Sequence, residues 1–126
     1  MSNYQFDHIH LRSPDPINTA QFYETMFGAR ILETQKRSWG TLVRLDLNGQ
    51  LLLVSPPPPA KDARLAQYGL NHFGLKTDNL EKTVGTLKAK GITFVQEITT
   101  VPPATKVSFF LAPENVLVEL LSESSS

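Results

Sequence analysis

The stretch Phe6-Asp7-His8-Ile9-His10-Leu11 returns later in the chain as Leu70-Asn71-His72-Phe73-Gly74-Leu75. Residues 5–12 alternate as in a β-strand, with Phe6, His8 and His10 on one face. All three histidines of the chain lie on these two stretches. The sequence therefore predicts two strands of the same kind, each with a histidine in the same place.

The residues after the first stretch predict one helix and three further strands. Ser13-Pro14-Asp15-Pro16 offers an aspartate N-cap with proline at the first helical position, and Gly28 is a typical C-terminal stop. Asn48-Gly49 is a strong hairpin signal between two apolar runs. The expected strands are residues 29–35, 39–47 and 50–54, which gives the order β-α-β-β-β.

The same order starts again after a connector that is rich in proline. Asp78, followed three residues later by Glu81, predicts a capping box for a second helix that ends near Gly91. The strands expected after it are residues 92–97, 105–112 and 116–121. We expect a single domain over residues 1–126, with repeat modules 5–54 and 69–122 joined by a connector over residues 55–68.

Composition excludes several classes of partner. The chain has 126 residues, a formal net charge of +0 with neither sign bunched, and no cysteine. A nucleic-acid partner or an anionic membrane surface is therefore not expected. There is no signal-like start and no run near the ~20 apolar residues of a membrane span. We expect a cytoplasmic protein with a small-molecule substrate.

The last predicted strand carries one carboxylate in an apolar run, Val116-Leu117-Val118-Glu119-Leu120-Leu121. An uncompensated buried charge is costly, so Glu119 needs a partner. Two imidazoles, from His8 and His72, and this carboxylate form a plausible three-ligand metal face with open positions. The alternative is that both histidines bond backbone carbonyls while Glu119 pairs with an arginine such as Arg44.

These features together resemble the vicinal oxygen chelate superfamily, which contains glyoxalases, bleomycin-resistance proteins and extradiol dioxygenases. The resemblance is carried by Phe6 to Leu11 with the following Asp-Pro and Phe-Tyr, by the repeat around His72, and by the closing strand after Pro-Glu-Asn. It implies an α+β fold in which two βαβββ modules form an incomplete barrel. It also implies that His8, His72 and Glu119 bind a divalent metal.

One departure from the family pattern concerns the number of ligands. Glyoxalase I and the related epimerases usually have a fourth ligand, Glu or Gln, at the position that Leu53 occupies here. The chain is therefore more similar to the three-ligand members, for which Fe or Mn is favoured and Zn, Ni or Co is possible. A dioxygenase or lyase acting on a substrate with two neighbouring oxygens is the expected function.

Two alternative functions remain at this point. One is a metal-free, ligand-sequestering protein of the bleomycin-resistance kind, and the other is glyoxalase I-like isomerisation or lyase chemistry despite the missing fourth ligand. His10 is predicted as the catalytic residue, a general acid or base, although it can equally be a wall of the pocket. Arg44 and Asp46 share a strand face that the register does not identify. A homodimer is expected because two-module chains leave sheet edges open.

Overall fold

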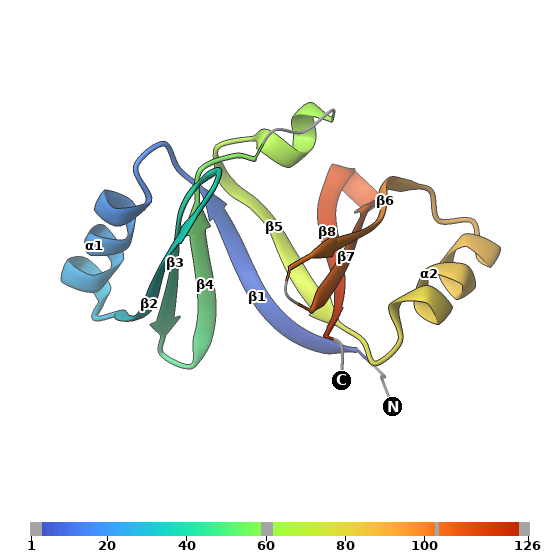
Figure 1. The fold of residues 1–126 in the computed structure, drawn as a ribbon, viewed down its shortest axis with the longest axis horizontal. Helices are drawn as coiled ribbons and strands as arrows, with labels where there is room; N and C mark the ends of the chain where they lie inside the picture. Colours follow the sequence, from blue (N-terminus) through green and yellow to red (C-terminus); the bar gives the residue numbers. More distant parts are fainter. Residues whose placement is uncertain (1–3, 59–61, 103, 124–126) are drawn as a thin grey trace. The chain divides into compact units, whose positions relative to one another are not determined.

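Two βαβββ modules follow one another along the chain (Figure 1). The structure is a computed structural model that describes residues 4–58, 62–102 and 104–123. The first module contains β1 (Gln5–Arg12), α1 (Pro16–Phe27), β2 (Arg30–Arg37), β3 (Gly40–Leu47) and β4 (Gln50–Ser55). The second contains β5 (Gly69–Lys76), α2 (Leu80–Ala89), β6 (Phe94–Val101), β7 (Thr105–Ala112) and β8 (Val116–Glu123). In the described residues the strands form a mixed sheet of eight that does not close, which confirms the predicted α+β class.

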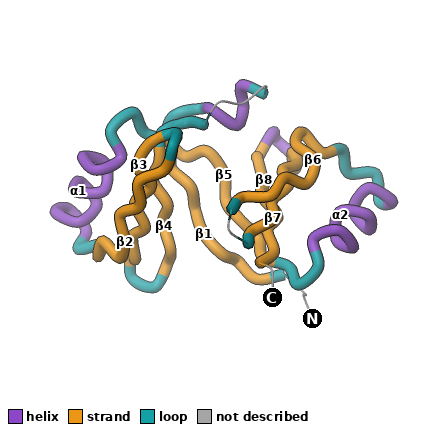
Figure 2. The backbone as a smooth tube through the Cα atoms, in the orientation of Figure 1, coloured by secondary structure: helices purple, strands orange, loops and turns teal. Residues whose placement is uncertain are grey.

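The first module orders its strands β2-β3-β4-β1, with β1 parallel to β4 and the other neighbours antiparallel. α1 lies alongside these strands (Figure 2). Its Ala20 is fully buried in a core with apolar side chains from the strands, including Leu11, Val43, Leu45 and Val54. The core of this module therefore lies on the side of the strands that faces α1. Strand residues that alternate with the core residues project from the opposite side.

The second module repeats the arrangement, with the order β5-β8-β7-β6 and β5 parallel to β8. Leu80 and Val84 of α2 pack with Leu120 of β8, and the partly buried Phe94 and Phe110 pack against this cluster. As in the first module, one face of the helix covers one face of the strands.

The repeat extends to single hydrogen bonds. The hydroxyls of Ser13 and Thr19 are 2.7 Å apart, and those of Thr77 and Thr83, each 64 positions later, are also 2.7 Å apart. The amide of Ser13 donates to the carbonyl of Ser55 at 2.9 Å, as the amide of Thr77 does to Leu121 at 2.9 Å. The two modules thus share one scaffold, and differences between their side chains reflect something other than the fold.

Two compact units divide the chain differently from the modules. One unit is residues 8–72, and the other joins residues 73–126 with residues 1–7. Both β1 and β5 therefore contribute residues to each unit. The single domain and the module boundaries given above stay predictions.

Local signals in the sequence were mostly correct. Asp15 caps α1 by accepting the amide of Asn18 at 3.1 Å, and Asn48-Gly49 joins β3 to β4 with positive φ at both residues. The capping box at Asp78 was wrong, because Asn79 caps α2 and accepts the amide of Lys82 at 3.1 Å. The connector also contains a short 3₁₀ helix, Ala63–Ala66, that the sequence did not indicate.

Neither helix in the described part of the chain has the length and apolar character needed to cross a membrane.

Candidate metal centre

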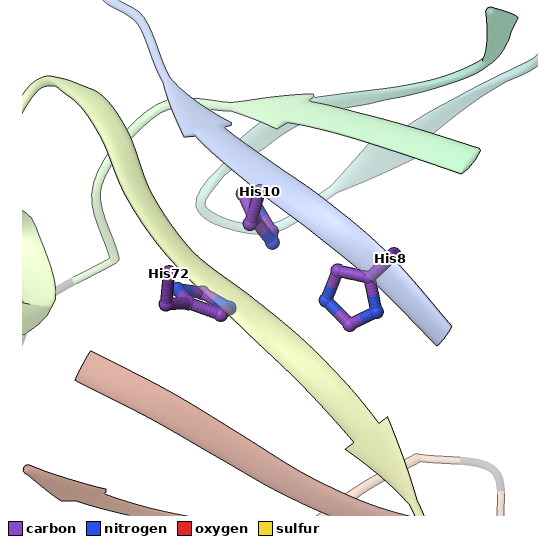
Figure 3. Close-up of side chains that lie close together, drawn as sticks. All are labelled: His8, His10 and His72. Carbon is purple, nitrogen blue, oxygen red and sulfur yellow. The ribbon is translucent and has the colours of Figure 1, made fainter. Parts of the chain in front are cut away.

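Three buried histidines come together in the unit of residues 8–72. His8 and His10 project from β1 and His72 projects from β5 (Figure 3). The ring centroids of His8 and His72 are 5.8 Å apart, and those of His10 and His72 are 4.9 Å apart. One nitrogen from each ring lies within 4.8 Å of the others, a spacing that suits three groups around one metal ion. The sequence predicted that these histidines would gather, and they do.

Strand alternation explains why His8 and His10 share this site. Ile9 and Leu11 pack into the core beneath α1, so His8 and His10, at the alternate positions, project from the opposite face of β1. Their exposed fractions are only 3% and 8%, which is low for imidazoles. The site is therefore a buried cluster of imidazoles on the face of β1 that α1 does not cover.

The amide of Asn71 fixes the tautomer of His72. Its nitrogen donates to the backbone carbonyls of Arg64, Leu65 and Gln67 at 3.2, 3.3 and 2.9 Å. Its oxygen must then be the atom that lies 2.6 Å from Nδ1 of His72, and an amide oxygen only accepts. The proton sits on Nδ1, so the neutral ring carries its lone pair on Nε2. A side-chain oxygen behind a histidine is a frequent feature of metal ligands, because it orients the ring and raises its basicity.

Sequence reasoning missed the role of Asn71. Adjacent residues of a strand usually project to opposite faces, so nothing in the pattern paired Asn71 with His72. The contact depends on the 3₁₀ helix in the connector, whose carbonyls hold the amide in place. Nδ1 of His72 thus bonds a side chain, whereas the alternative given above had both histidines bond backbone carbonyls.

His10 lies in a different network, with Arg12 and Ser55. Nε2 of His10 is 2.8 Å from the hydroxyl of Ser55 and 3.1 Å from Nη1 of Arg12, which itself donates to that hydroxyl at 2.8 Å. Burial, and then the positive charge of Arg12, hold the pKa of His10 well below its ordinary value of 6.5. The imidazole of His10 is therefore neutral at physiological pH.

The register of the strands identifies the face that carries Arg44 and Asp46. His10 pairs with Leu53 across β1 and β4, and Leu53 pairs with Arg44 across β4 and β3. Paired residues project to the same side, so Leu53 and Arg44 share the face of His10, and Asp46 follows two positions along. Arg44 lies 4.0 Å from Glu33 in a solvent-exposed ion pair, which contributes little to stability.

Glu119 lies in the other compact unit, on β8. It is buried between Gly74 of β5 and Phe109 of β7 in the register of the sheet. Because it is buried, this carboxylate needs a partner, as expected from the sequence. Its ligation of a metal, together with that of His8 and His72, stays a prediction.

A pocket of about 390 Å³ opens near the end of β1. This volume is within the range of sites that bind small molecules. Its lining residues are Leu11, Arg12, Ser13, Pro14, Thr19, Tyr23, Tyr68, Gly69 and Leu70. Arg12 thus contacts both this pocket and His10.

Comparison with known proteins identifies the family. The model of the Glyoxalase/Bleomycin resistance protein/Dioxygenase superfamily matches residues 5–120, nearly the whole chain. The protein belongs to this superfamily. The resemblance stated from the sequence is confirmed, and so is the pair of βαβββ modules that it implied. Among curated proteins, no sequence matches the chain.

Solved structures of the superfamily share the fold over almost the full chain. The hypothetical protein BH1468 from Bacillus halodurans C-125 has a TM-score of 0.78 at 17% identity, covering 99% of this chain and 98% of its own. Methylmalonyl-CoA epimerase from Mycobacterium tuberculosis has a TM-score of 0.72 at 15% identity, covering 94% and 87%. A variant of the Streptomyces coelicolor epimerase, in complex with 2-nitronate-propionyl-CoA, has a TM-score of 0.71 at 18% identity, covering 98% and 97%. The superfamily therefore includes enzymes, and these identities establish a common fold alone.

Proposed function

We propose that the protein is a metal-dependent enzyme that binds a small substrate through two adjacent oxygens. The observation that carries the proposal is the cluster of buried imidazoles, His8, His10 and His72, with one nitrogen of each within 4.8 Å of the others. The nitrogens of buried imidazoles need polar partners, and a metal ion bound between the rings would be one such partner. Neutral imidazoles are good ligands for Fe, Mn, Ni, Co and Zn.

The residues present fit such a metal. His8 and His72 are the proposed imidazole ligands, with Asn71 orienting His72 so that its Nε2 carries the lone pair. Glu119 is the proposed carboxylate ligand, supported by its burial in an apolar strand. Bound there, a divalent cation would supply Lewis acidity toward the two substrate oxygens. The favoured metals are Fe and Mn.

Leu53 supports a dioxygenase or lyase over a four-ligand isomerase. The resemblance implies that Leu53 occupies the position at which the four-ligand members carry Glu or Gln, and this buried apolar side chain shares the face of His10. Three protein ligands leave more positions for a chelating substrate. Catechols, α-hydroxyketones and precursors of enediols present the required pair of oxygens.

Elemental analysis of protein purified without added metal tests this function. The expected result is close to one equivalent of Fe, Mn or another first-row metal, followed by turnover of a catechol or α-hydroxyketone that requires this metal. Protein that retains no metal, and does not take up Fe²⁺, Mn²⁺ or Zn²⁺ when titrated, would instead be a ligand-sequestering member of the superfamily.

The support given to His72 by Asn71 leads to a quantitative prediction. Asn71→Ala should weaken metal binding by about 10- to 100-fold, since loss of an outer hydrogen bond frees the ring and its tautomer. The affinity is measured by competition with a chromophoric chelator. Asn18→Ala, at an exposed position on α1, is the control and should not change the affinity. Equal affinities in both variants would contradict the role of Asn71.

We also propose a homodimer in the cytoplasm. In the described part of the chain, β2 and β6 stand at the ends of the strand order and are hydrogen-bonded on one side only. Open edges of this kind favour pairing with a second copy. Light scattering on the eluting protein should give about twice the chain mass of 14.0 kDa. A monomeric mass at micromolar concentration would contradict this prediction.

A further inference from the structure

The contacts of His10, Arg12 and Ser55 form a closed triangle. The parallel register of β1 and β4 places Arg12 opposite Ser55, and His10 lies two positions before Arg12 on the same face. The three distances are 2.8, 2.8 and 3.1 Å, and all three side chains are buried. Each group is therefore held by the other two.

Hydrogen-bonding capacity decides which nitrogen of His10 carries a proton. A guanidinium only donates, so Nη1 of Arg12 must meet a lone pair on Nε2. The Ser55 hydroxyl, which accepts from Arg12, then donates to Nε2, so the single lone pair of this nitrogen is shared by the two donors. The remaining proton of the neutral ring is then on Nδ1. The opposite tautomer would direct an N–H of His10 toward an N–H of Arg12.

The second module provides an internal comparison. The scaffold positions equivalent to His10, Arg12 and Ser55 are Gly74, Lys76 and Leu121, and Lys76 pairs with Leu121 in the same parallel register. Lys76 is partly exposed and lies 3.6 Å from Glu123. Because this module forms the same strands without the triangle, the fold does not require it.

We propose that Arg12 and Ser55 are positioning residues that hold His10 as its Nδ1–H tautomer, so that His10 donates a hydrogen bond to a substrate oxygen and is not a third metal ligand. The part that concerns substrate rests on the proposed function. The substrates favoured by this arrangement gain negative charge on an oxygen, as catechols and enediols do when they lose a proton. A neutral N–H donor stabilises such an oxygen without being deprotonated itself.

Nitrogen NMR of the histidine rings tests the tautomer directly. With three histidines in the chain, the ring signals are few, and the His10 signals are those missing in His10→Gln. In metal-free protein we expect Nδ1 of His10 to be protonated and Nε2 to be an acceptor. On addition of Zn²⁺, which is diamagnetic, the signals of His8 and His72 should shift while Nδ1 of His10 keeps its proton. An Nε2–H tautomer, or Zn²⁺ bound to His10, would overturn the proposal.

Variants then test the positioning residues. Arg12→Met should convert the single His10 tautomer into a mixture, whereas Arg12→Lys, which keeps a donor, should retain most of the Nδ1–H form. Ser55→Ala gives an independent test if Arg12→Met does not fold, and should also produce a mixture. Lys76→Met changes the equivalent position of the second module and should leave the His10 signals unchanged. An unchanged tautomer in both Arg12→Met and Ser55→Ala would contradict the assignment.

The two proposals can fail separately. If no metal binds, the proposed function fails, while the tautomer in metal-free protein still decides the role of Arg12 and Ser55. If metal binds through His8, His10 and His72 together, the metal-dependent function survives and the donor role of His10 is lost.

Discussion

Replacing His72 with alanine is expected to abolish tight binding of a divalent metal while the protein stays folded. The change removes an imidazole whose Nε2 lone pair is fixed by Asn71, so affinity should fall by more than the roughly 100-fold that outer-shell changes cause. The apolar clusters beneath α1 and α2 do not include His72, so folding should persist. Elemental analysis gives the metal content, and circular dichroism with urea unfolding gives the stability.

A matched control for this variant lies on the same strand. Leu70→Ala changes a side chain that is 73% exposed and should retain metal content and stability. Stoichiometric metal in the His72→Ala protein would remove His72 from the ligand set. Unfolding of His72→Ala in the absence of metal would show instead that the site contributes to the core.

Leu53→Glu is expected to have the second largest effect. Leu53 is buried and pairs with His10 across the parallel strands, so a carboxylate at this position enters the same side of the sheet as the histidines. Without metal, the buried charge should reduce the free energy of unfolding by on the order of 1–3 kcal/mol. With metal, the carboxylate gains a partner, so affinity should rise and metal should restore part of the stability.

Measuring turnover separates the effect of Leu53→Glu on metal affinity from its effect on substrate binding. If substrate uses the position that the new carboxylate closes, turnover should fall although metal binds more tightly. Leu53→Met keeps an apolar group of similar volume and controls for lost packing. Urea unfolding with and without Zn²⁺, and chelator competition, provide the readouts. Unchanged metal affinity in Leu53→Glu would mean that this side chain does not reach the metal.

Much of the fold was predictable because the signals were local. Strand alternation around His8, proline after the Asp15 cap and the Asn48-Gly49 turn each act within a few residues, and the repeat around His72 predicted the second module from the first. The start of α2 was wrong by one residue, because both Asp78 and Asn79 are good capping residues and only the chain path decides between them.

The site was predictable only in part. Histidines on matching strands were visible in the sequence, and their gathering in space followed from the repeat. Asn71, Arg12 and Ser55 were not identified, because their contacts depend on a 3₁₀ helix and on the register of β1 with β4. Neither the 3₁₀ helix nor the pairing register produces a periodic pattern in the sequence. The tautomers of His10 and His72 are consequences of these contacts, so no reading of composition or spacing could have supplied them.

The sharing of β1 between two compact units has a consequence for how the chain is synthesised. Phe6 stacks on Phe73 with ring centroids 5.7 Å apart, and Tyr4 packs with the cluster around Leu80. The ribosome makes these first residues long before their partners emerge. The beginning of β1 must therefore wait for the second half of the chain, and such non-local contacts slow folding. Residues 8–12 of the same strand can meet their partners in β4 much earlier, so one strand is completed in two stages of translation.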